Sequence, residues 1–110
     1  MKIIIETPQV KARESLLSYI RDKVSKLESF SDRLVEARVT LRVDQTSDRE
    51  NKVCGIRAGI PGNDLYAEKQ AATFEEATLK TLDAIKRQLV DWKEKGEVQP
   101  AKVQPLKVSS

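Results

Sequence analysis

The sequence predicts an α+β fold of order βαβββα, in which two helices pack on one face of a four-stranded sheet. Two stretches repeat apolar side chains every three or four positions, as amphipathic helices do, and the remaining apolar segments alternate with polar residues or are β-branched, as strands do. Because each strand has one apolar side and each helix one apolar stripe, the two layers must meet. A chain of 110 residues, 39% of them hydrophobic, supports one core.

The first strand and the first helix follow from a change of period near the start. Residues 3–5 are three isoleucines and predict a strand, which Pro8 ends because it lacks a donor for the sheet. A helix over about residues 12–28 follows. Its predicted apolar face comprises Leu16, Leu17, Ile20, Val24, Leu27 and Phe30.

Residues 35–45 alternate without interruption and predict a half-buried strand. Val35, Ala37, Val39, Leu41 and Val43 are expected to face the helices, and Glu36, Arg38, Thr40, Arg42 and Asp44 the solvent. Residues 54–60 and 65–71 predict two more strands, joined by a tight turn at Pro61-Gly62-Asn63. Short connections make these three strands an antiparallel meander.

The second helix is expected to begin at Thr73, which has capping-box spacing to Glu76, and to close with Lys93, Lys95 and Gly96. Its apolar face would comprise Phe74, Ala77, Thr78, Leu82, Ile85, Leu89 and Trp92. Trp92 could instead be an exposed platform for a base, but its place on this stripe favours the core. We expect residues 1–96 to form one domain and residues 97–110, which have two prolines and no helical period, to form a flexible tail.

Catalytic chemistry is poorly represented. The chain has no histidine, no phosphate-binding glycine loop and a single cysteine, Cys54, which lies among apolar residues and is expected to be buried and inert. We therefore expect no enzyme, no cofactor, no metal site and no small-molecule substrate. Only a run of three apolar residues, Ile3 to Ile5, precedes Glu6, which is too short for a signal peptide, and no segment is long enough to cross a membrane. The expected location is the cytoplasm.

Basic residues are the main indication of function. The net charge is only +3, with a pI near 9.1, so the distribution of charge matters more than its sum. At 100° per residue, Lys86 and Lys93 share one flank of the second helix and Lys80 and Arg87 share the other. These rows suit contacts with RNA, although pairing with acidic neighbours such as Asp83 along the helix is an alternative.

Five features of the chain together resemble the ribosome hibernation-promoting factors, a family that includes ribosome-associated inhibitors once called sigma-54 modulation proteins. They are the βαβββα order itself, SKLESFSDRL at residues 25–34, the alternating VEARVTLRV, the hairpin PGNDLYAE and LDAIKRQLVDWKEK in the second helix. The likeness covers residues 1 to about 96. It implies a fold similar to double-stranded-RNA-binding domains, and the absence of a second domain implies a short form of the family.

The resemblance also implies a function and its residues. Such proteins bind the small ribosomal subunit and the 70S ribosome near the decoding region, where they contact 16S rRNA through basic residues of both helices and exclude mRNA and tRNA. The positions in this chain that match are Lys23, Lys26, Lys86, Arg87, Lys93 and Lys95, and the pattern above adds Lys80. The alternative is a regulatory protein-interaction module of the sigma-factor type, acting through Arg38 and Arg42 on the exposed sheet face.

Overall fold

The structure is a computed structural model that describes residues 1–46 and 49–94. The elements are β1 (Lys2–Glu6), α1 (Glu14–Ser25), the short 3-10 helix η1 (Lys26–Ser29), β2 (Glu36–Val43), β3 (Lys52–Ile60), β4 (Asn63–Ala71) and α2 (Phe74–Glu94). The predicted α+β fold and its βαβββα order are confirmed. Lys95, Gly96 and the predicted tail of residues 97–110 lie outside the described residues.

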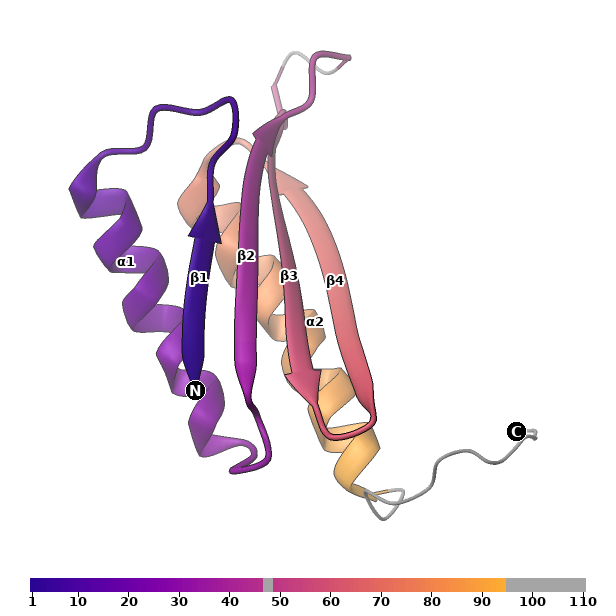
Figure 1. Cartoon of the computed structure of the whole chain (residues 1–110). Helices are drawn as coiled ribbons and strands as arrows, with labels where there is room; N and C mark the ends of the chain where they lie inside the picture. Colours follow the sequence, from indigo (N-terminus) through magenta and orange to yellow (C-terminus); the bar gives the residue numbers. More distant parts are fainter. Residues whose placement is uncertain (47–48, 95–110) are drawn as a thin grey trace.

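The four strands form one mixed sheet in the order β1-β2-β3-β4. β1 is parallel to β2, while β2, β3 and β4 form the predicted antiparallel meander. A parallel neighbour requires a crossover connection, and α1 supplies it between β1 and β2. Figure 1 shows both helices on the same face of the sheet, with α1 beside β1 and α2 behind β3 and β4. The other face is open.

Several boundaries differ from the sequence prediction; β1 spans Lys2–Glu6 and β3 begins at Lys52, so both strands are longer than expected. α1 begins at Glu14 and gives way to η1 at Lys26, so the expected single helix is two helical segments. β4 begins at Asn63, because Pro61 and Gly62 alone make the turn, with Gly62 at φ 78°. Val35 is 64% exposed: its backbone bonds to Gly59 and Lys2, but it lies before β2, where the buried layer ends.

The core lies between the sheet and the two helices. α1 and η1 bury Ile20, Val24 and Leu27, the sheet buries Ala37, Val39, Leu41, Cys54, Ile56 and Ala58, and α2 buries Ala77, Leu82, Ile85 and Leu89. Trp92 is partly buried against this cluster, as predicted for a core residue. Burial of this apolar surface is the main stabilising contribution to the fold, and it fixes how α2 sits against the sheet.

Side chains at the start of α2 and along its length bond to polar groups of the backbone. The Thr73 hydroxyl accepts a hydrogen bond from the Glu76 N–H at 3.1 Å, the predicted N-cap contact. Along the outer edge of β4, the Gln88 amide donates to the Tyr66 carbonyl at 2.9 Å and the Lys80 ammonium donates to the Gln70 carbonyl at 3.4 Å. α2 is thereby attached to the sheet by polar contacts as well as by the core.

Candidate nucleic-acid interface

Phe30 organises two of the predicted lysines. It follows η1, and its ring packs against the core. The Lys86 ammonium lies 5.3 Å from the centre of this ring, and the Lys93 ammonium donates to the Phe30 carbonyl at 3.0 Å. An ammonium has three donors and Lys93 uses one here, so both lysines retain donors for a further acceptor. One residue therefore holds two cations in place on the flank of α2 that faces the end of α1.

Lys23 in the last turn of α1 and Lys26 at the start of η1 add two cations. The Lys23 ammonium lies 5.4 Å from the centre of the Tyr19 ring, and Lys26 opens η1, four positions before Phe30. The Lys26 ammonium approaches Asp22 at 4.0 Å, and both side chains are exposed. An exposed pair at that distance is weak, so Lys26 is not locked in it.

The opposite flank of α2 faces β4. Here Lys80 and Arg87 line a shallow hollow of about 270 Å³ together with Lys69, Asp83 and Ala84. The Arg87 guanidinium pairs with Asp83 at 3.0 Å, which is the i,i+4 pairing considered from the sequence. The two flanks thus lie on opposite sides of the helix as expected, with Lys86, Arg87, Val90 and Asp91 lining a second depression between them.

The two faces of the molecule differ in how their cations are paired. Within residues 1–46 and 49–94, the ammonium groups of Lys23, Lys80, Lys86 and Lys93 contact rings or carbonyls and form no ion pair with a carboxylate. On the open sheet face, Arg38 pairs with Glu6 at 3.0 Å and Arg42 pairs with Glu68 at 3.1 Å. A ring or carbonyl partner does not neutralise the positive charge, so these four ammonium groups remain available to an anion.

Cys54 is buried on β3 beneath α2. Burial raises the pKa of its thiol above the ordinary value of 9.0, and the Thr78 hydroxyl lies 3.6 Å from the sulfur. The thiol is therefore protonated at neutral pH and unreactive, as predicted. Among the described residues, no cluster of three metal-binding side chains occurs, and no helix has the length and apolar character needed to span a membrane.

Sequence reasoning missed the residues that position the cations. Phe30 and Tyr19 were assigned to the core or passed over, and no local pattern identifies an aromatic ring as a support for a lysine. Lys69 could have been predicted from the sequence. It follows the apolar residues Leu65 and Ala67 at every second position along the strand, so its side chain must lie on the side of the sheet where α2 packs. Lys95, the last predicted contact, is outside the described residues.

The family described as Sigma 54 modulation protein / S30EA ribosomal protein has a model that matches residues 3–97. The chain belongs to this family. A curated relative, the ribosome hibernation promotion factor of Deinococcus radiodurans, is 33% identical over 86 residues, which are 76% of this chain. The chain spans 44% of that relative's length. These names describe association with ribosomes and no reaction, in agreement with the prediction of a non-enzymatic protein.

Solved structures support the fold of this family member. A ribosomal subunit interface protein from Coxiella burnetii matches with a TM-score of 0.76 at 14% identity, covering 86% of this chain and 99% of the other. The N-terminal domain of Protein Y from Thermus thermophilus matches with a TM-score of 0.69 at 19% identity, covering 84% and 99%. At such identities the likeness establishes the shared fold.

Proposed function

We propose that this protein is a ribosome hibernation factor of the cytoplasm that inhibits translation by binding the small ribosomal subunit. It would bind 16S rRNA near the decoding region, in free subunits and in 70S ribosomes, and exclude mRNA and tRNA from that region. The contacts would come from Lys23 and Lys26 at the end of α1, from Lys80, Lys86, Arg87 and Lys93 on α2, and from Lys95 beyond the described residues.

One observation supports this function above the others: four lysines on the helix face have uncompensated charge. A polyanion gains most from cations that no carboxylate already neutralises, and each phosphate contact releases counterions. The support of Lys86 and Lys93 by Phe30 also reduces the conformational freedom that these side chains lose on binding. Family membership agrees with this partner, since the relatives' names refer to ribosomes.

The inhibition we propose is steric. The sheet and both helices share one core, so the domain is rigid, and the basic rows on the two flanks of α2 would hold it by electrostatic contacts with the rRNA backbone. Such contacts set position and orientation without reading sequence. An occupied decoding region then leaves no room for mRNA and tRNA, and no chemical step is required.

The alternative, a protein-interaction module acting through Arg38 and Arg42, has less support. Both guanidinium groups are already paired with carboxylates on the sheet, so a partner protein would have to displace those pairs. This alternative predicts binding that depends on Arg38 and Arg42 and varies little with salt. The ribosome proposal predicts binding that does not depend on these arginines and weakens strongly as salt increases.

Cosedimentation with purified 30S subunits and 70S ribosomes tests the proposal. The double variant Lys86→Glu/Arg87→Glu reverses two charges on the helix face, and we expect it to abolish binding at moderate salt while the fold persists. The matched control is Lys11→Glu/Arg13→Glu, which makes the same change in charge at exposed positions before α1, where the loop after β1 ends.

The comparison separates a local contact from a general effect of charge. Loss of binding in both double variants would mean that only net charge matters. Undiminished binding of Lys86→Glu/Arg87→Glu would refute the proposed interface. Circular dichroism and thermal unfolding of both variants establish that they are folded, and a translation assay with mRNA added before or after the protein tests whether the two compete.

A further inference from the structure

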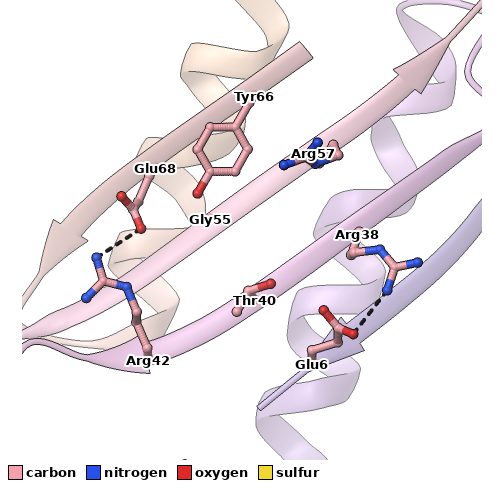
Figure 2. Close-up of a pocket in the computed structure, with 8 residues that line it drawn as sticks. All are labelled: Glu6, Arg38, Thr40, Arg42, Gly55, Arg57, Tyr66 and Glu68. Atoms are coloured by element: carbon pink, nitrogen blue, oxygen red, sulfur yellow. Dashed lines mark hydrogen bonds and ion pairs between the residues drawn. The ribbon is translucent and has the colours of Figure 1, made fainter. Parts of the chain in front are cut away.

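The open face of the sheet has a hollow of about 500 Å³, on the side away from the helices and independent of the proposed ribosome interface. All four strands contribute to its lining, as Figure 2 shows, and the residues are Glu6, Arg38, Thr40, Arg42, Gly55, Arg57, Tyr66 and Glu68. Its volume is in the range of small-molecule sites. Three arginines and two glutamates on its walls make it polar, and each arginine has a carboxylate partner.

Gly55 lets Tyr66 lie across the floor of this hollow. A Cβ at position 55 would be 2.7 Å from the Tyr66 hydroxyl oxygen, so only glycine leaves room for the ring to extend over β3. The Tyr66 side chain is 50% exposed, and the Arg57 guanidinium lies 5.6 Å from the ring centre. An exposed ring bordered by a guanidinium is a suitable platform for stacking a nucleic-acid base.

Arg38 and Arg57 lie directly opposite each other in the register of β2 and β3. Like charges in facing positions are unfavourable, and each guanidinium turns to a different carboxylate. Arg38 pairs with Glu6 at 3.0 Å and with Glu36 at 3.5 Å, whereas Arg57 reaches Asp64 only at 3.7 Å. These exposed pairs are weak, and a phosphate between the two guanidinium groups would replace them and remove the repulsion.

Glu68 supplies a second recognition element beside Tyr66, two positions along the same strand and on the same face. Its Oε2 accepts from Arg42 at 3.1 Å. Among the contacts of the described residues, Oε1 receives no donor, so it can accept from a ligand. A carboxylate next to a stacking platform favours a base whose edge has N–H donors. Guanine has an N–H and an NH₂ side by side on that edge, while adenine has only the NH₂.

We propose that this hollow binds a guanine nucleotide unit, either free or within a single RNA strand. The base stacks on Tyr66 and donates to Glu68, and the phosphate accepts from Arg38 and Arg57. Three features combine in this site: the glycine that admits the ring, the facing arginines and the available carboxylate oxygen. No covalent step is involved, and the site is separate from the basic rows of α2.

Titration of the ¹⁵N-labelled protein followed by NMR tests the proposal. We expect GMP to shift the amides of β2, β3 and β4 around Gly55 and Tyr66 saturably, with affinity about tenfold higher than that of AMP. Tyr66→Leu should weaken GMP binding about tenfold, the usual contribution of one stacked base. Gly55→Ala should also weaken it, because the new methyl group displaces the hydroxyl end of the ring. Lys86→Glu/Arg87→Glu should bind GMP normally.

A second titration identifies the source of the nucleotide, with the pentanucleotide UUGUU as the strand. A site for a strand binds UUGUU at least tenfold more tightly than GMP, and a site for a free nucleotide binds GMP as tightly or more so. The proposal is overturned if neither ligand shifts the sheet amides at millimolar concentration, if inorganic phosphate alone reproduces the GMP shifts, or if the shifts are confined to α2. None of these outcomes depends on ribosome cosedimentation, so the two proposals fail separately.

Discussion

Lys93, near the end of α2, donates a hydrogen bond to the main-chain carbonyl of Phe30 at 3.0 Å, across 63 positions of sequence. This bond links the end of α2 to the loop after η1, where the Phe30 ring also supports Lys86. The relative placement of the two lysines is therefore set by the tertiary structure and not by the helix alone.

Phe30→Leu should weaken binding to 30S subunits about threefold, because leucine keeps the apolar contact with the core but removes the ring beneath Lys86, a contribution of about 0.5–1 kcal/mol. The measurement is a cosedimentation isotherm at low salt, with Phe30→Tyr as the control that retains a ring. If Phe30→Leu binds like the unmodified protein while Lys86→Gln is impaired, the ring has no role in positioning that lysine.

Lys80→Gln and Lys93→Gln test whether both flanks of α2 contact rRNA at the same time. Each neutralisation should lower the slope of log affinity against log salt by about 1, and the double variant by about 2. Distant contacts add, so a double variant no weaker than one of the singles would mean that only one flank touches the phosphates. Lys11→Gln is the control outside the interface.

Asp83→Asn should increase affinity for 30S subunits at low salt. The substitution removes the carboxylate that pairs with Arg87 at 3.0 Å, leaving the guanidinium free for phosphate, and the gain should disappear as salt screens the interaction. Glu14→Gln makes the same change in charge in the first turn of α1. An equal gain in both variants would attribute the effect to net charge and not to Arg87.

Thr73→Ala should lower the free energy of unfolding by about 1 kcal/mol, because the Glu76 N–H loses its hydroxyl acceptor at the start of α2. Thr73→Ser retains the acceptor and should be nearly neutral. Urea unfolding followed by circular dichroism measures both. An alanine variant as stable as the serine variant would show that water replaces the cap without cost.

Cys54 should make stability fall as pH rises above 9. Burial raises the pKa of this thiol in the folded protein above 9.0, so at higher pH the unfolded chain loses the proton first and the folded state is disfavoured. Between pH 8 and pH 10, the free energy of unfolding measured in urea should fall more steeply in the unmodified protein than in Cys54→Ala. The lysines titrate in both proteins, so comparing the two removes their contribution. Equal losses would mean that the thiol ionises alike in both states.

The sequence predicted the features that depend on local periodicity and missed those that depend on pairing across the fold. Alternation in residues 35–45 identified β2, and the angular spacing of Lys80, Lys86, Arg87 and Lys93 identified the two flanks. The hollow on the sheet was not predicted, because Gly55 and Tyr66 become neighbours only through the β3–β4 register. The pairing of Arg42 with Glu68 likewise spans 26 positions, which no local pattern encodes.

The contacts from Gln88 and Lys80 to the backbone of β4 bear on how the protein behaves at high concentration. An unprotected edge strand presents carbonyls and N–H groups to which another chain can add a strand. Here two of the outward carbonyls, those of Tyr66 and Gln70, already have donors from α2, and the Lys80 ammonium would have to be displaced, with its charge, by an incoming strand. The same helix that carries the two basic rows thus also hinders the chain from polymerising through its own sheet.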